Sequence, residues 1–161
     1  MGLSIGFGYS GKKFYGRDYT LSQLMDKEFN SSEEIEDQFY CSTCKAHSSR
    51  CRKAISIYRA PTYLWIHMKR FKKSTFSCTK IDEAVDVPLK LDMSPYLMDK
   101  KSCTYNLFGI IHHHGTINRG HYTADCKTLS GKWFHFDDEV ASQKEPLLNS
   151  SSAFVLFYKL D

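Results

Sequence analysis

The stretch YNLFGIIHHHGTINRGHYTADCK, residues 105–127, decides the fold of this chain. It holds two runs rich in aromatic and β-branched residues, and the turn sequence between them contains two glycines. Runs of this kind are typical of paired β-strands. Two more such runs follow, KWFHFDD (132–138) and AFVLFYKL (153–160), and the turn sequence TLSG (128–131) precedes the first of them. The four runs together predict an antiparallel meander.

Upstream of this region the signals are weaker and mixed. The first nineteen residues carry five glycines without periodicity and predict a loop or a weakly specified extended segment. Residues 20–29, TLSQLMDKEF, predict a short amphipathic helix, in which Thr20 can cap the start and Gln23 can complete a capping box. Its apolar face would consist of Leu21, Leu24, Met25 and Phe29.

The middle of the chain predicts two strands followed by a polar excursion. AISIYRA (54–60) and YLWIHMKRF (63–71) alternate, and Leu64, Ile66 and Met68 share one face of the second run. Residues 71–97 are polar and interrupted by two prolines, which predicts an exposed segment with short strands. At 161 residues we expect one domain of the α+β class, mostly antiparallel β with few short helices.

Charge and composition argue against two classes of partner. Lys and Arg number 22 against 18 Asp and Glu, and no basic face with interleaved aromatics marks a nucleic-acid surface. No window approaches the roughly eighteen apolar residues of a membrane span, and the first twenty residues lack an apolar signal-peptide core. The six cysteines are then better interpreted as thiols or metal ligands than as disulfides. We expect no nucleic acid, no membrane, and an intracellular location in the cytoplasm, the nucleus or both.

A histidine and two adjacent aspartates form the candidate catalytic site. If the strands at 121–127 and 132–138 pair around TLSG, His121 and Asp137 face each other at one end of the hairpin. An imidazole that takes a proton and a carboxylate that fixes its tautomer are two parts of a nucleophilic triad. Asp138 would point to the other face unless the strand ends there. The alternative is that His121 and Asp137 only satisfy each other at a sheet edge.

Six ordered motifs resemble those of the ubiquitin-specific proteases, the large cysteine-protease family of deubiquitinases. They run from about residue 20 to the end: YCSTC, RAPTYLWIHMKRF, YNLFGIIHHHG, RGHYTADC, KWFHFDDEV and AFVLFYKL. The resemblance implies part of a papain-like catalytic domain over 1–161, with a fingers-like segment at about 20–60 and a palm-like meander at about 61–161. It also implies ubiquitin, held by its carboxyl-terminal tail, and ubiquitinated proteins as partners.

The resemblance also assigns roles to individual residues. His121 matches the general base, Asp137 the residue that orients it, and Asp138 a neighbouring acidic position. The segment HHHGTINRG (112–120) matches a mobile loop that borders the cleft for the ubiquitin tail. His113 and Gly115 fit the pattern of that loop, while Arg119 stands where a second glycine is frequent.

The family's nucleophile box, which resembles N-x-G-N-T-C-Y-x-N-S, does not occur in these 161 residues. Cys126 is a poor substitute, because it would face the side of its strand opposite His121, with roughly 17 Å of strand between their backbones. Cys78 and Cys103 sit in no motif. We therefore expect the chain alone to lack peptidase activity.

One cysteine pair has the spacing of metal ligands. By resemblance, Cys41 and Cys44 would be half of a zinc ribbon, but tetrahedral zinc wants four ligands. No cofactor is required for the expected chemistry, and three possibilities stay open for zinc. The chain binds no metal, or it holds half of a shared site, or His47 and Cys51 complete a local set.

Three functional interpretations remain open at this point. The first is a portion of a deubiquitinase whose full-length form hydrolyses bonds to the carboxyl terminus of ubiquitin. The second is a catalytically inactive relative that binds ubiquitin or scaffolds a partner. The third is an unrelated β-rich binding module. The ordered motifs disfavour the third, and the presence of both His121 and Asp137 favours the first.

Overall fold

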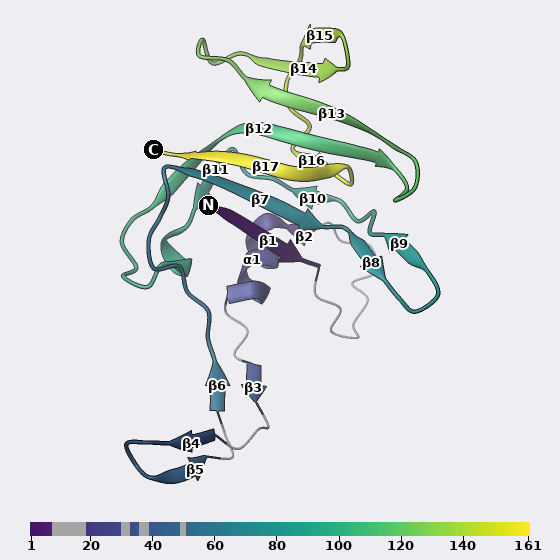
Figure 1. Cartoon of the computed structure of the whole chain (residues 1–161). Coiled ribbons are helices and arrows are strands. Elements are labelled where there is room, and N and C mark those ends of the chain that lie inside the picture. The colour runs from purple at the N-terminus through teal and green to yellow at the C-terminus, as the bar shows by residue number, and fades with distance from the viewer. Residues whose placement is uncertain (8–18, 30–32, 36–38, 49–50) are drawn as a thin grey trace.

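The computed structural model describes residues 1–7, 19–29, 33–35, 39–48 and 51–161, and an eight-stranded sheet forms its centre (Figure 1). Seven strands follow one another across the sheet, and β11 (Lys90–Asp92) pairs beside β12. In spatial order the seven are β1 (Gly2–Gly6), β7 (Tyr63–Lys69), β17 (Ala153–Leu160), β12 (Thr104–Gly115), β13 (Gly120–Lys127), β14 (Trp133–Asp137) and β15 (Val140–Gln143).

The predicted meander is correct for three strands and wrong for the fourth. β12, β13 and β14 are antiparallel neighbours, with Asp125 opposite His135 in the second pair. β17, however, lies between β12 and β7 and does not pair with β14 (Figure 1). Its sequence AFVLFYKL is apolar at nearly every position, which is typical of a strand in the middle of a sheet with contacts on both faces.

The first residues form a strand, where a loop or a weakly specified extended segment was expected. β1 pairs in parallel with β7, and Ile5 on this strand is fully buried. The strand was not predicted because it is only five residues long and both its first and last residues are glycine. Such a segment is too short to show a clear alternation of apolar and polar residues. The part of the same expectation that concerns residues 8–18 lies outside the described residues.

The helix and the second middle strand are confirmed. α1 (Leu21–Phe29) begins after Thr20, whose N–H donates to Gln23 Oε1 at 3.0 Å while the Gln23 N–H donates to Thr20 Oγ1 at 3.2 Å. This reciprocal pair is a capping box. The apolar faces of α1 and β7 meet in one core cluster, and their buried members are Leu21, Leu24, Met25, Phe29, Leu64, Ile66 and Met68.

The strand predicted at 54–60 does not form. Ile57 alone makes an isolated bridge, to Leu97, while Tyr58 is 80% exposed. The chain before it forms two small ladders that extend away from the sheet (Figure 1). They pair β3 (Glu33–Ile35) with β6 (Cys51–Lys53), and β4 (Phe39–Cys41) with β5 (Ala46–Ser48).

The exposed excursion predicted at 71–97 is correct only in its first part. β8 (Phe71–Lys73) and β9 (Cys78–Lys80) form a hairpin whose tip exposes Phe76 almost fully. From residue 81 the chain enters the core, where Ile81, Val85, Val87, Leu91 and Met93 are buried. A small three-stranded sheet in this region consists of β16 (Asn149–Ser150), β10 (Val85–Asp86) and β2 (Tyr19–Thr20). Farther along the same segment, η1 (Ser94–Tyr96) is a 3-10 turn.

The class is α+β, as predicted, since one α-helix accompanies many strands in the described part of the chain. Among the described residues, no helix has the length and apolar character needed to cross a membrane. The division into a fingers-like segment at 20–60 and a palm-like segment at 61–161 stays a prediction.

Candidate functional site

The structure brings His121 and Asp137 into contact, as the pairing of their strands predicts. His121 is the second residue of β13 and Asp137 is the last residue of β14. The distance between His121 Nε2 and Asp137 Oδ1 is 2.5 Å, and both side chains are about half exposed. Asp137 therefore holds the imidazole by one nitrogen. Nδ1 makes no hydrogen bond to any described residue and can take up a proton.

The electrostatic surroundings favour a charged imidazole at this position. The hydrogen bond to Asp137 raises the pKa of His121 above its ordinary value, and the charges of Asp137 and Asp138 act in the same direction. A carboxylate that raises the basicity of an imidazole in this way also stabilises the imidazolium that forms after proton transfer. His121 and Asp137 (the site pair) thus have the geometry of a general base and its orienting group.

Asp138 lies next to the site pair because the strand ends before it. Its φ of 48° is in the left-handed region, which Asp adopts more readily than most residues. One oxygen or nitrogen from each of His121, Asp137 and Asp138 lies within 4.8 Å of the others. The backbone turn therefore keeps this carboxylate near the imidazole, and its functional role stays a prediction.

The segment predicted as a mobile loop, 112–120, is mostly strand. Residues 112–115 belong to β12, Gly120 begins β13, and only the turn between them is irregular, closed by the Thr116 N–H donating to Arg119 O at 2.8 Å. Gly115 has a φ of 99°, which favours glycine. A Cβ on Gly120 would lie 2.1 Å from His113 Nε2. Both glycines are thus needed for a tight hairpin end.

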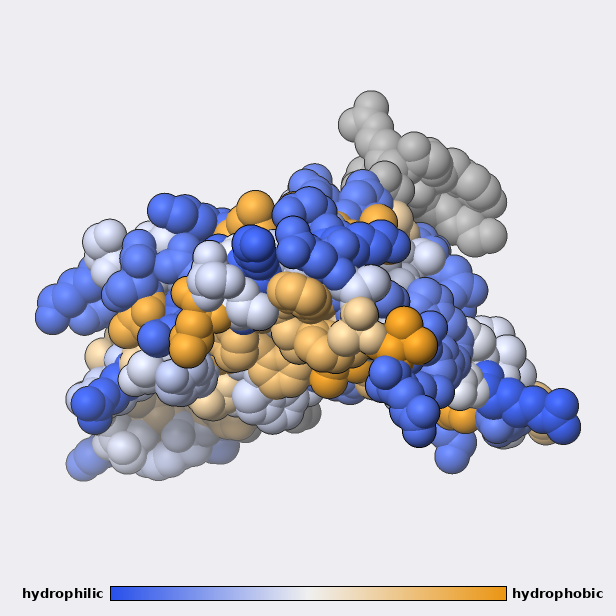
Figure 2. Space-filling model, turned by 90° about the horizontal axis from the view of Figure 1, so that it is seen from above, coloured by the Kyte–Doolittle hydropathy of each residue, from blue (hydrophilic) through white to orange (hydrophobic). Residues whose placement is uncertain are grey.

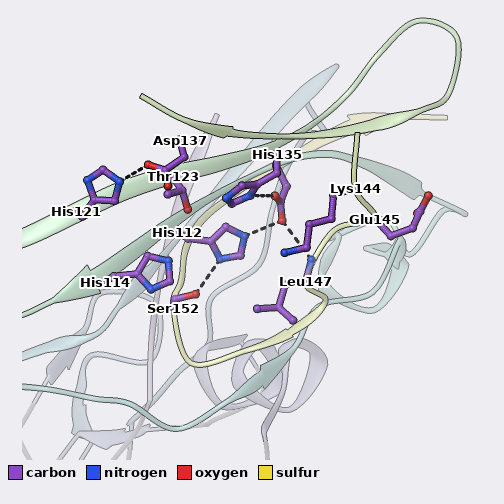
Figure 3. A pocket seen from close by; sticks show the side chains of 11 residues that line it. His112, His114, His121, Thr123, His135, Asp137, Lys144, Glu145, Leu147 and Ser152 are labelled. Atoms are coloured by element: carbon purple, nitrogen blue, oxygen red, sulfur yellow. Dashed lines mark hydrogen bonds and ion pairs between the residues drawn. The ribbon is translucent and has the colours of Figure 1, made fainter. Parts of the chain in front are cut away.

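A polar cavity of about 290 Å³ lies beside the site pair (Figure 3). Sequence reasoning missed the residues of its inner wall. Asp125 accepts hydrogen bonds from His135 Nδ1 at 2.6 Å and His112 Nε2 at 2.9 Å, and Ser152 contacts the other nitrogen of His112 at 3.0 Å. The signal was present as period-2 spacing, His121-x-x-x-Asp125 on one strand and His135-x-Asp137 on the next.

An open apolar groove of about 510 Å³ lies on the opposite face of the sheet. Its walls come from β12, β13, β14 and β17, and Asp138 lies at its edge. The apolar members are Ile111, Tyr122, Ala124, Phe136, Phe154 and Val155. The groove is therefore suited to an extended, largely apolar or small-residue segment.

No described cysteine is placed to serve as the nucleophile for His121. Cys126 lies on the opposite face of β13, as its odd separation from His121 predicts, and burial raises the pKa of its thiol. Burial also raises the pKa of Cys103, which lies outside both cavities. A thiol with a raised pKa carries little thiolate at neutral pH and is a poor nucleophile.

Cys41 ends β4 and Cys44 lies in the turn that follows, where the two could provide two thiolate ligands. Hydrogen bonds from Cys44 and Thr43 lower the pKa of Cys41 to about 7, which favours the ligating form. His47 packs its ring on Tyr40 at 5.2 Å, and Cys51 lies on a different ladder, its side chain outside the described part. The pair fits half of a tetrahedral zinc site, and zinc binding stays a prediction.

Comparison with known families matches residues 22–158 to the family model described as ubiquitin carboxyl-terminal hydrolase. Ubiquitin carboxyl-terminal hydrolase 15 of Rattus norvegicus is 39% identical over an alignment of 138 residues that covers 81% of this chain and 14% of the relative. Ubiquitin carboxyl-terminal hydrolase 10 of Arabidopsis thaliana is 38% identical over an alignment of 158 residues that covers 94% of this chain and 17% of that relative.

Solved structures of deubiquitinase modules are also similar to this chain. The SAGA DUB module of Ubp8, Sgf11, Sus1 and Sgf73 bound to monoubiquitin matches with a TM-score of 0.83 and 29% identity. The match covers 99% of this chain and 35% of that chain. A structure of the yeast SAGA DUB module matches with a TM-score of 0.81 over the same shares. The chain thus spans a minor part of the proteins that it resembles.

Proposed function

The chain belongs to the ubiquitin carboxyl-terminal hydrolase family, and we propose that its site pair is the base and orienting group of a deubiquitinase. The observation that carries this proposal is the 2.5 Å contact of His121 Nε2 with Asp137, which leaves Nδ1 able to accept a proton. The reaction is the thiol-dependent hydrolysis of bonds to the carboxyl terminus of ubiquitin. The thiol is expected from a nucleophile box of the family type, which residues 1–161 do not contain.

Proton transfers can be followed through the site pair. His121 Nδ1 takes the proton of the attacking thiol, and the resulting imidazolium is stabilised by the Asp137 carboxylate. As the acyl bond to the thiol forms and the bond to the leaving amine breaks, the imidazolium returns its proton to that amine. In the second half of the reaction His121 removes a proton from water, which attacks the thioester, and then protonates the leaving thiolate.

The apolar groove is the proposed seat of the carboxyl-terminal tail of ubiquitin. The groove lies on the face of the hairpin opposite the site pair, with Asp138 at its edge. One carboxylate oxygen of Asp138 lies within 4.8 Å of ligand atoms of His121 and Asp137, so a tail that leaves the groove past Asp138 reaches the site pair. In a ¹⁵N-ubiquitin titration, Tyr122→Ala should weaken binding and reduce the shifts of the tail resonances. Tyr58→Ala, at an exposed side chain that does not line the groove, is the control. Unchanged tail shifts with the Tyr122 variant would place the tail elsewhere.

A chimera tests the catalytic role directly. The part of this chain that aligns with the Arabidopsis relative, 94% of its residues, would replace the matching segment of that relative, and hydrolysis of a ubiquitin carboxyl-terminal fluorogenic amide would be measured. We expect turnover that His121→Ala reduces by roughly 10²- to 10⁴-fold, the usual contribution of a general base. Cys126→Ala should not change it. A folded but inactive chimera would instead favour the catalytically inactive ubiquitin-binding relative.

The isolated chain provides the complementary measurement. Incubated with ubiquitin that carries an electrophilic carboxyl terminus, it should form no adduct detectable by intact mass, because no described thiol lies against His121. An adduct that disappears when one cysteine is mutated would reveal a nucleophile within the chain and overturn this part of the proposal.

We also propose that Cys41 and Cys44 supply two of four zinc ligands, the others coming from a partner segment or from local side chains. Cobalt substitution followed by absorption spectroscopy would report thiolate ligation, and Cys41→Ser should remove the signal while Cys126→Ser keeps it.

The described cysteines are all free thiols, which supports a reducing compartment, the cytoplasm or the nucleus.

A further inference from the structure

Two His–Asp hydrogen bonds connect β13 and β14 on the same face of the sheet. In one the histidine comes from β13, and in the other it comes from β14. β13 presents His121, Thr123 and Asp125 to this face, and β14 presents His135 and Asp137. In the first bridge the histidine comes from β13, and in the second, Asp125 with His135, it comes from β14. All five side chains line the polar cavity (Figure 3).

The carboxylate of the second bridge is buried, and both of its oxygens accept hydrogen bonds. The side chain of Asp125 is 4% exposed and accepts three hydrogen bonds, from His135, from His112 and from the Leu147 N–H at 3.2 Å. Burial alone would raise the pKa of Asp125, but these hydrogen bonds lower it to about 2, so the carboxylate stays charged. A buried charge with all its partners is costly to disturb and holds those partners in place.

The chain of hydrogen bonds continues into the segment that covers the cavity. With Asp125 ionised, His112 donates from Nε2, and its Nδ1 is hydrogen-bonded to the Ser152 hydroxyl at 3.0 Å. Ser152 in turn contacts Ser150 Oγ at 2.7 Å, and Ser150 Oγ accepts from the Ala153 N–H at 3.2 Å. Asp125 therefore ties β12, β13, β14 and the start of β17 into one rigid unit.

The first bridge, in contrast, cannot hold itself in place. His121 and Asp137 are 48% and 51% exposed, and an exposed pair of this kind contributes little free energy. Asp137 is also the terminal residue of its strand, where the ladder ends. The short contact between the two side chains must therefore be maintained by the strands that carry them.

We propose that Asp125 is a positioning residue for the site pair. Its buried bridge to His135 fixes the register and twist of β13 against β14, and this keeps His121 Nε2 within hydrogen-bond reach of Asp137. The inference rests on the proposed role of the site pair as base and orienting group. Four residues of strand, roughly 13 Å, separate Asp125 from His121, so any influence passes through the strands rather than through direct charge interaction.

The test is a pH titration of the histidine rings by NMR in the ¹⁵N-histidine-labelled 161-residue chain. The Asp137→Asn variant gives the pKa that His121 has without its carboxylate partner. Asp125→Asn and His135→Phe should each remove at least half of the difference between the wild-type pKa and that value. Glu145→Gln removes a charge at the cavity rim without touching either bridge, and it should leave His121 unchanged.

The two bridge variants distinguish position from charge. His135→Phe leaves the negative charge of Asp125 in place, so a drop in the pKa of His121 there can only come from a displaced pair. His135 is 27% exposed, and this variant is expected to fold even if Asp125→Asn does not, with the β7 and β17 amide shifts of a uniformly ¹⁵N-labelled sample as the check. If the pKa of His121 is unchanged in the His135→Phe variant, the positioning role of Asp125 is overturned. If the pKa of His121 is unchanged in the Asp137→Asn variant, the proposed site pair is overturned instead. The two variants therefore distinguish failure of the positioning role from failure of the site pair.

Discussion

Arg70 is a buried anchor of this fold. It is completely buried, and its guanidinium donates to four backbone carbonyls, those of Ile81, Glu83, Ser150 and Ala153. Its plane also lies over the Phe7 ring at 4.9 Å. One side chain thus joins the end of β7, the start of β17 and the segment that enters the core.

Arg70→Lys should therefore destabilise the chain by about 3 kcal/mol or more, because an ammonium has fewer donors and no planar fork, and buried carbonyls lose their partners. Urea denaturation followed by circular dichroism would measure this. Arg59→Lys, on the surface, is the matched control and should change the free energy of unfolding by less than about 0.5 kcal/mol. Equal stability of both variants would contradict the anchoring role.

The site pair should contribute stability that depends on pH. Because contact with Asp137 raises the pKa of His121 in the folded state, this contribution is fully present below the ordinary histidine pKa and is lost as pH rises through the folded value. Asp137→Asn should then lower the urea midpoint more at about pH 5 than at about pH 9. The same loss at both pH values would show that His121 is not charged in the pair.

At the scale of elements, the β12–β13 hairpin depends on a glycine that the strand pattern alone does not explain. A Cβ on Gly120 would lie 2.1 Å from His113 Nε2 and 2.9 Å from the His114 carbonyl oxygen. Since a carbonyl in a ladder cannot move freely, Gly120→Ala should cost about 1–3 kcal/mol. Gly6→Ala, where no atom lies within 4 Å, is the control, and both would be compared by thermal unfolding. A neutral Gly120→Ala would mean that the hairpin end is loose.

The elements also show where sequence reasoning is strong and where it fails. The capping box at Thr20, the alternation at Leu64, Ile66 and Met68, and the contact of His121 with Asp137 were all predictable, since each depends on local periodicity or on one tight turn. The partners of β1 and β17 were not, because pairing across the whole chain leaves no local pattern. Asp125 was missed for a related reason, since its three hydrogen-bond partners, His112, His135 and Leu147, lie 13, 10 and 22 residues away in sequence.

At the scale of the whole molecule, one face of the sheet is apolar and open. Figure 2 looks down on the side of β13 to β15 and shows apolar side chains gathered in a band between polar margins. Trp65, Tyr122 and Phe136 are each more than 40% exposed. Exposed apolar surface of this kind is typical of a region that binds a partner or associates with itself.

The isolated chain should therefore associate as its concentration rises, which sedimentation velocity would detect. Tyr122→Gln combined with Phe136→Gln should weaken the association by removing apolar area from the open face. Tyr58→Ser removes an exposed aromatic from a distant segment and should not. A monomer at all concentrations, with a sharp reversible melting transition, would contradict this expectation.

The central place of β17 has a consequence for how the protein is made. Ribosomes build the chain from its first residue, so β7 and β12 emerge long before the strand that must lie between them. Until residues 153–160 are released, the sheet exists as two halves with unpaired edges, which are targets for chaperones and sites of aggregation. A premature stop codon anywhere before Ala153 would then remove the middle of the sheet, and cellular quality control would meet an unfolded product rather than a shortened enzyme.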